Sequence, residues 1–239
     1  MIICSIDTSG RDGSLALAHW EPGTTPASFE SLQVLRFVPV AGGTYSAQLI
    51  PLLNRALDET KIRKTGIGLF AVASGPGSFT GLRVGLSTVK ALGEAFGKPV
   101  VAISVLEAIA AGTGRTGAVI AALDAQRAEV YVGEYSLNPQ SVWPVTPVHE
   151  ALAAVDDFTA SLRGRLPVAT FTPDAAIQAK VQDAGAPVEL VVRPGADQFA
   201  RLGAMKFAAG LITPVEELDA NYIRRSDAEI FSAPKPGSR

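Results

Sequence analysis

Residues Ala73–Leu92 read ASGPGSFTGLRVGLSTVKAL, and this stretch decides how the chain around it folds. The apolar run Ile67–Ala73 that leads into it is typical of a buried strand. The Gly-Pro-Gly that follows is typical of a tight turn, because glycine adopts positive φ angles without a steric cost. Ser78 or Thr80 can then accept hydrogen bonds from the first amides of a helix. The sequence therefore predicts a strand, a glycine-rich turn and a helix that ends at Gly97.

The glycine turn matches neither of the two common phosphate-binding motifs. A P-loop needs a lysine directly after its second glycine, and the first lysine after this turn is Lys90. The dinucleotide fingerprint fails because Gly81 stands one residue too far from Gly77. Anion binding at the helix N-terminus stays physically possible, but the spacing does not specify it.

The predicted helix has one face without side chains. Gly81 and Gly85 are four residues apart and therefore lie on the same side of the helix. An interior glycine costs about 1 kcal/mol relative to alanine, so two of them indicate that another part of a protein approaches closely. The neighbour can belong to the same chain, for instance to a helix over Tyr45–Asp58, or to a partner protein. Both alternatives stay open at this point.

Outward from this stretch, the chain predicts an α/β protein in which one unit occurs twice. In the first half, strands are expected at Ile2–Ile6, Ser14–Trp20, Phe29–Phe37, Ile67–Ala73 and Val100–Ile103, with helices at Ser46–Leu57 and Thr80–Phe96. In the second half, strands are expected at Ala118–Leu123, Glu129–Tyr135 and Val142–Val148 and near Val168 and Val188–Val191, with helices at Glu150–Leu162, Pro173–Ala184 and Ala196–Leu211. The two βββαβα units predict a duplicated ribonuclease-H-like fold, as in the actin, sugar kinase and Hsp70 superfamily. The alternative is a generic α/β domain.

The expected organisation is an N-terminal lobe over 1–104, a C-terminal lobe over 105–231 and a disordered tail over 232–239. The first strand of each lobe runs into an aspartate and a turn, at Asp7 and at Asp124. In an actin-like fold these turns face a central cleft, where they coordinate the metal of a bound nucleotide. Thr8 and Ser9 keep some phosphate-loop character after the first aspartate. The alternative interpretation is that each aspartate caps its own turn.

Composition and charge limit the functions that this chain can have by itself. Hydrophobic residues make up 47% and charged residues 18% of the 239 residues, and the net charge is −2. Such a surface argues against strong nucleic-acid binding by the chain alone. The single cysteine, Cys4, stands in an apolar run and is expected to be a core residue. No apolar run approaches the roughly 18 residues of a membrane span, so we expect a cytoplasmic protein with no membrane contact.

Few side chains offer metal or nucleophile chemistry. His19 and His149 are far apart in sequence and have no partner at ligand spacing, so no metal site is expected. The basic cluster Lys61–Lys64 is interpreted as a solvated loop after the first long helix. Arg83, near the start of the next helix, is a candidate anchor for an ion pair at an interface.

Four segments, which together span nearly the whole chain, resemble one known family. They are Ile3–Ser9 (ICSIDTS), Ala73–Leu92 with its distinctive part Gly75–Arg83 (GPGSFTGLR), Asp124–Tyr131 (DAQRAEVY) and Asn221–Arg224 (NYIR). In this order they resemble the TsaB (YeaZ) family, the partner subunits of the bacterial machinery that forms threonylcarbamoyladenosine in tRNA. The resemblance implies an actin-like fold of two lobes whose nucleotide and metal site has decayed.

The resemblance also implies the partners and the reaction. A TsaB-like chain is not an enzyme by itself; it pairs with TsaD through helices, and this platform recruits the ATPase TsaE. The complex attaches threonylcarbamoyl to N6 of the adenosine beside the anticodon in tRNAs that read ANN codons. ATP and a metal are used by the partner subunits, no cofactor is bound by this chain alone, and tRNA is contacted only indirectly. A homodimer is implied when TsaD is absent.

The family implies a partner interface on two helices and no catalytic residue. The expected interface residues are Ser46, Leu49, Leu53, Ser78, Phe79, Thr80, Gly81, Leu82, Arg83, Gly85, Leu86 and Val89. The vestigial nucleotide-cleft candidates are Asp7, Thr8, Ser9 and Asp124. Tyr45 stands where the family often has histidine, which leaves the details of affinity open. The rival hypothesis is an actin-like small-molecule kinase or a residual M22-type peptidase that uses the two turn aspartates.

Overall fold

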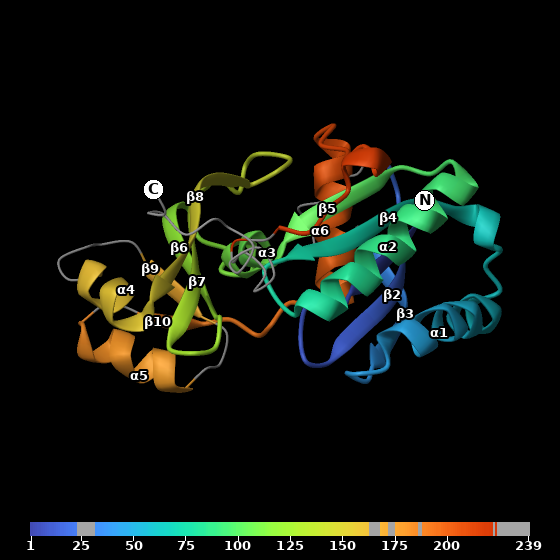
Figure 1. Cartoon of the computed structure of the whole chain (residues 1–239). Helices are drawn as coiled ribbons and strands as arrows, with labels where there is room; N and C mark the ends of the chain where they lie inside the picture. Colours follow the sequence, from blue (N-terminus) through green and yellow to red (C-terminus); the bar gives the residue numbers. More distant parts are fainter. Residues whose placement is uncertain (23–31, 163–167, 172–174, 186–187, 222, 224–239) are drawn as a thin grey trace, which may run out of the picture.

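The structure is a computed structural model, and it describes residues 1–22, 32–162, 168–171, 175–185, 188–221 and 223. Two five-stranded sheets lie side by side, each with its own helices (Figure 1). The first sheet is built from β1 (Ile2–Asp7), β2 (Gly13–Trp20), β3 (Leu32–Val40), β4 (Ile67–Gly75) and β5 (Val100–Ser104). Its order is β3-β2-β1-β4-β5, with β1–β3 antiparallel and β4 and β5 parallel to β1.

The second sheet repeats this topology. It contains β6 (Gly117–Asp124), β7 (Glu129–Leu137), β8 (Val145–Ala154), β9 (Val168–Phe171) and β10 (Val188–Leu190). Its order from the other edge is β8-β7-β6-β9-β10, with β6–β8 antiparallel and β9 and β10 parallel to β6. The duplicated ribonuclease-H-like arrangement predicted from the sequence is therefore confirmed.

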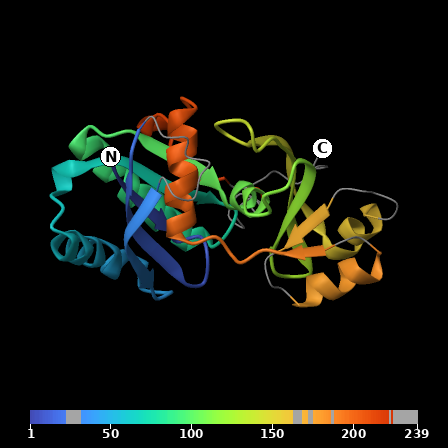
Figure 2. The same cartoon turned by 180° about the vertical axis from the view of Figure 1, so that it is seen from behind.

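Helices cover both faces of the first sheet. The helices α1 (Tyr45–Thr60) and α2 (Phe79–Phe96) lie on one face, and α6 (Ala196–Ala208) lies on the other, as Figures 1 and 2 show from opposite sides. Side chains along β1 point alternately to the two faces of the sheet and so contribute to both layers. Ile3 packs in the layer of α6, whereas Cys4 and Ile6 pack in the layer of α1 and α2. Burial raises the pKa of the Cys4 thiol to about 12, which fits the core role expected for it.

The second sheet is covered by helices on both faces as well. The helices α4 (Val155–Ser161) and α5 (Ala175–Asp183) pack on one face, and the short α3 (Val105–Ala111) packs on the other. Thus α3 follows the first sheet in sequence but covers the second, while α6 follows the second and covers the first. The division of the chain at residue 104 stays a prediction, and this exchange of helices ties the two halves together.

Three details differ from the sequence-based expectations. The sequence pattern did not predict α3. The helix expected at Glu150–Leu162 begins only at Val155, because β8 continues to Ala154 as the edge strand beside β7. The first long helix begins at Tyr45, one residue before the expected start. Residues 29–31 of the expected third strand and the tail 232–239 lie outside the described residues.

Candidate functional site

The glycine face of α2 packs against this chain itself. Ser78 precedes the helix, and its Oγ accepts a hydrogen bond from the Gly81 amide at 3.3 Å. A Cβ atom on Gly81 would lie 2.0 Å from the Thr8 carbonyl oxygen, and one on Gly85 would lie 2.3 Å from Thr8 Oγ1. The turn between β1 and β2 is thus the close neighbour that the glycines accommodate. Of the two alternatives left open, the structure supports the same-chain one, with a turn in place of the expected helix.

This packing buries part of the expected partner interface within the chain. Buried side chains on α1 and α2 complete the layer between these helices and the first sheet, so they are not part of the exposed surface. Seven of the expected interface residues are buried within this chain, and their contact with a partner stays a prediction: Leu49, Leu53, Gly81, Leu82, Gly85, Leu86 and Val89.

The remaining expected residues are exposed at the amino ends of the two helices. We define the α1–α2 surface as Ser46, Ile50, Ser78, Phe79, Thr80 and Arg83. Phe79 is 40% exposed, and the Arg83 guanidinium carbon lies 3.7 Å from the centre of its ring. Ile50 is 42% exposed, and the sequence interpretation missed it. The signal was available, because Ile50 is an apolar residue outside the stripe formed by Leu49 and Leu53.

The turn after β1 is closed on itself. Asp7 is only 3% exposed, and its Oδ1 accepts hydrogen bonds from the amide (2.8 Å) and the hydroxyl of Ser9. The hydroxyl of Thr8 donates to the Gly81 carbonyl at 2.7 Å, and the Ser9 carbonyl accepts from the Ser78 amide at 2.7 Å. The polar groups that would meet a phosphate are therefore engaged within the chain.

Arg193 is a further member of this cluster, and it was not predicted. Its Nη2 donates to Ser9 Oγ at 2.9 Å across 184 residues of sequence. Burial raises the pKa of Asp7, and the Arg193 guanidinium and the hydrogen bonds from Ser9 oppose that rise. Arg193 is thus the cation that compensates the buried carboxylate.

Replacing Arg193 with methionine should destabilise the protein by roughly 2 kcal/mol at neutral pH, because Ser9 loses a charged donor and Asp7 loses its cation. The pKa of Asp7 is higher in the folded protein than in the unfolded chain. The Asp7 carboxyl therefore contributes stability below its ordinary pKa, and this contribution is lost as the pH rises through the folded-state pKa. Without Arg193 that loss grows, so the variant should lose less stability at acidic pH than at neutral pH. Chemical denaturation at both pH values measures this, and an equal loss at both would contradict the role of Arg193.

Asp124 caps its own turn. Its carboxylate accepts a hydrogen bond from the Gln126 amide at 2.8 Å and a second one from the Gln126 side chain. Three consecutive residues of this turn have positive φ angles: 63° at Gln126, 57° at Arg127 and 59° at Ala128. Asp7 and Asp124 therefore make these hydrogen bonds each within its own turn, and the self-capping interpretation is confirmed for both.

A polar network joins the two sheets. Glu150 on β8 accepts hydrogen bonds from Ser104 Oγ at 2.8 Å, from Asn221 Nδ2 at 2.6 Å and from the Tyr135 hydroxyl. Burial, together with the neighbouring Glu150, raises the pKa of Tyr135, which keeps its hydroxyl a donor. Ser104, Glu150 and Asn221 border a hollow of 640 Å³ between the lobes, which is also lined by Ser74, Ala102, Glu107, Pro147, Val148, His149 and Lys206.

Replacing Glu150 with alanine should lower the free energy of unfolding by roughly 2 kcal/mol, because three partly buried donors lose their acceptor. Glu216→Ala is the matched control, since this glutamate is exposed in the short η3 helix (Val215–Glu217). Urea denaturation of both variants compares the two losses. Equally small losses of unfolding free energy in the two variants would mean that the hydrogen bonds of Glu150 do not hold the two lobes together in solution.

Two features are absent from the residues that the structure describes. No helix there is both long and apolar enough to cross a bilayer. No group of three or more histidine, cysteine, aspartate or glutamate side chains there is placed to hold a metal ion.

The sequence of this chain is similar to those of known proteins. Residues 39–169 match the family described as TsaD, tRNA N6-adenosine threonylcarbamoyltransferase. The chain is 29% identical over 239 residues to the tRNA threonylcarbamoyladenosine biosynthesis protein TsaB of Escherichia coli K12, covering 95% of this chain and 96% of that protein. It is 28% identical over 155 residues to TsaB of Bacillus subtilis 168, covering 64% of this chain and 63% of that protein.

A solved structure supports the fold independently. YeaZ from Pseudomonas aeruginosa superposes with a TM-score of 0.71 at 23% identity, covering 93% of this chain and all of that one. At this identity the likeness establishes the fold alone. The family match spans more than half of the 239 residues. The chain therefore belongs to the TsaD family, and its similarity over nearly the full length is to a TsaB protein of this family.

Proposed function

We propose that this chain is a noncatalytic subunit in the biosynthesis of threonylcarbamoyladenosine in tRNA. It binds a TsaD-type protein, and with it TsaE, for transfer of threonylcarbamoyl to the adenosine beside the anticodon in tRNAs that read ANN codons. The single observation that carries the proposal is the match to the E. coli protein of this pathway over 95% of the chain. ATP and a metal belong, in this proposal, to the partner subunits.

The closed turn after β1 supports a noncatalytic role. The Asp7 carboxylate and the Thr8 hydroxyl are buried and hydrogen-bonded within the chain. A nucleotide phosphate at this turn would have to displace those bonds and separate α2 from it. This favours a binding subunit over the rival small-molecule kinase or M22-type peptidase.

The α1–α2 surface is the docking site that we propose for the partner. It offers two exposed apolar side chains, Ile50 and Phe79, and the guanidinium of Arg83 stacked on the Phe79 ring. Aromatic residues and arginine are enriched in protein interfaces, where they bury large areas with little loss of conformational entropy. When the partner is absent, a second copy of this chain covers the same surface in the proposal.

Sedimentation velocity of the purified chain, alone and mixed with the TsaD-type protein of the same organism, tests the proposal. We expect a homodimer alone and a mixed complex in the presence of the partner. Calorimetry with ATP on the isolated chain runs in parallel. Two separate species in the mixture, together with tight ATP binding by the isolated chain, would favour the kinase alternative and contradict the proposed function.

A further inference from the structure

A cluster of three cations stands at the far end of α1 from the α1–α2 surface. We define the basic loop as Lys61, Arg63 and Lys64, which lie at the junction of α1 and the short η2 helix (Lys64–Gly66), with Lys64 as the first residue of η2. All three residues are exposed, in a chain whose net charge is −2. Helix α1 separates the loop from Ser46 by roughly 22 Å. A protein docked at the amino ends of α1 and α2 therefore leaves the basic loop accessible.

The backbone of the basic loop is fixed. Lys61 ends α1 in the left-handed conformation, with φ 57°, and its amide bonds to the Asp58 carbonyl at 3.2 Å. The Ile62 amide bonds to the Leu57 carbonyl at 3.0 Å, and the Ile62 side chain packs against the core beneath α1. This is the usual way in which a helix end is closed. The three cations therefore project from a rigid frame.

No carboxylate neutralises the basic loop within the described part of the chain. Two other arginines near the end of α1 do form ion pairs: Arg36 and Arg55 both pair with Glu59 at 2.8 Å. Lys61, Arg63 and Lys64 form no ion pair with a described residue, although Asp58 lies beside the same hollow. Proximity to the carbonyl end of α1 favours a cation at Lys61, but Arg63 and Lys64 lie beyond that helix end. The positive charges of Arg63 and Lys64 are therefore not compensated by any described carboxylate.

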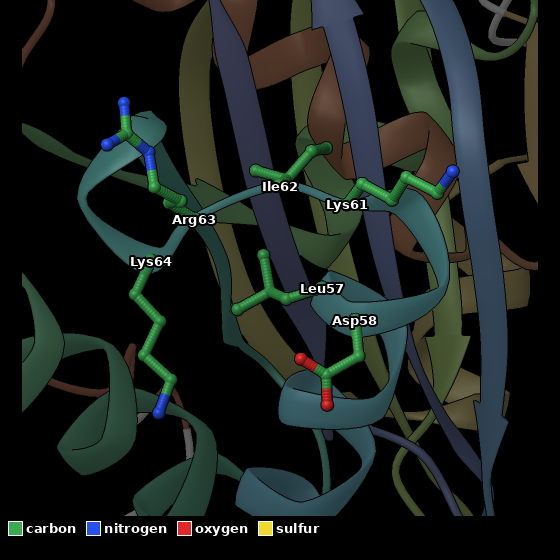
Figure 3. A pocket seen from close by; sticks show the side chains of 6 residues that line it. All are labelled: Leu57, Asp58, Lys61, Ile62, Arg63 and Lys64. Atoms are coloured by element: carbon green, nitrogen blue, oxygen red, sulfur yellow. The ribbon is translucent and has the colours of Figure 1, made fainter.

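The shape of the surface indicates the kind of anion. A hollow of 420 Å³ is lined by Leu57, Asp58, Lys61, Ile62, Arg63 and Lys64. Figure 3 shows that the cationic ends of Lys61, Arg63 and Lys64 spread away from one another instead of converging on one point. One small anion would need converging donors, whereas an extended polyanion with several phosphates can meet all three. Leu57 is 2% exposed, so the surface also lacks the apolar centre of a protein interface.

We propose that the basic loop contacts the phosphate backbone of the RNA that the complex modifies. The inference rests on the proposed function, which supplies the RNA, and it adds a direct contact where the resemblance implied only an indirect one. Three lysine or arginine contacts carry no base information but add affinity that depends on salt. The partner subunit then supplies the remaining contacts, in keeping with the net negative charge of this chain.

The test combines Lys61→Ala, Arg63→Ala and Lys64→Ala in one variant. The control combines Arg115→Ala, Arg127→Ala and Lys180→Ala, which removes three positive charges from exposed positions on the second lobe, where Arg115 and Lys180 pair with Glu189 and Asp156. The affinity for tRNA is measured against salt concentration for the complex with the TsaD-type protein and for the isolated chain. The loop variant should bind on the order of tenfold more weakly at low salt, with a salt slope about 2 units shallower, and the control should change little.

Unchanged affinity and slope in the loop variant would overturn the inference. Polyglutamate serves as a second probe. If the loop variant no longer binds polyglutamate but still binds tRNA, the basic loop is a surface for acidic proteins, and this result also overturns the inference. Failure of the proposed function is visible separately, because the unmodified chain then does not pair with the TsaD-type protein. In that case the measurement on the isolated chain tests the contact. A tenfold weaker tRNA binding by the isolated loop variant supports the contact, and unchanged binding contradicts it.

Discussion

Replacing Gly81 with alanine should lower the free energy of unfolding by roughly 3 kcal/mol. The new Cβ would stand 2.0 Å from the Thr8 carbonyl oxygen, which is a backbone atom and cannot rotate away. Helix α2 or the turn after β1 must then move, and the hydrogen bond from Thr8 Oγ1 to the Gly81 carbonyl is weakened. These losses exceed the gain of about 1 kcal/mol that alanine brings to a helix. Urea denaturation measures the difference.

Gly66→Ala is the control for this prediction. A Cβ on Gly66 would meet nothing nearer than 3.9 Å, so this exchange should change stability little. If Gly81→Ala proved as stable as the unchanged protein, the turn after β1 could not lie against α2 as described. The same geometry makes Gly85 unsuitable for testing a partner interface, because a larger side chain there meets Thr8 Oγ1 and disturbs the fold first.

Replacing Phe79 with aspartate should weaken binding of the TsaD-type partner about 100-fold, because a central aromatic anchor is lost and a charge is placed in the interface. Phe79 is 40% exposed, so the fold itself should tolerate the change. Isothermal titration calorimetry of the purified proteins measures the affinity, and circular dichroism confirms that the variant is folded.

Phe37→Asp provides a closely matched control. Phe37 is 42% exposed, and it lies on the edge strand β3 instead of the α1–α2 surface. The control should bind the partner as the unchanged protein does. Equal weakening by both variants, or by neither, would move the docking site away from the amino ends of α1 and α2.

The sequence was sufficient to predict the repeated order of strands and helices. Strand positions followed from short apolar runs, and the aspartates at the ends of β1 and β6 marked equivalent places in the two units. The pattern failed where tertiary contacts override local preference. At Glu150, β8 continues beside β7 through a segment whose residues also suit a helix. Short buried α3 lacks the length that makes a periodic pattern visible.

The site could be predicted only in part. The spacing of Gly81 and Gly85 predicts correctly that something approaches α2, but spacing does not identify the neighbour. Arg193 could not be placed beside Ser9, because that contact joins residues 184 apart. The basic loop was visible as a charge cluster, whereas its fixed backbone and its lack of ion pairs with described carboxylates emerge only from the structure.

The glycine-rich turn and α2 therefore have two different faces. One face holds the turn after β1 closed, and this removes the polar groups of Thr8 and Ser9 from solvent. The other presents Phe79 and Arg83 to solvent. In the proposed function, the first face keeps the turn closed and the second face is the one that docks the partner.

In the proposed function, this chain supports a reaction that it does not itself perform. The most direct measurement is the amount of threonylcarbamoyladenosine formed in tRNA by the TsaD-type protein and TsaE, with and without this chain, in the presence of ATP and the threonylcarbamoyl donor. We predict formation of the modified nucleoside only when this chain is present, and no formation by this chain alone. Equal formation in its absence would show that the reaction does not need this chain and would rule out the proposed function.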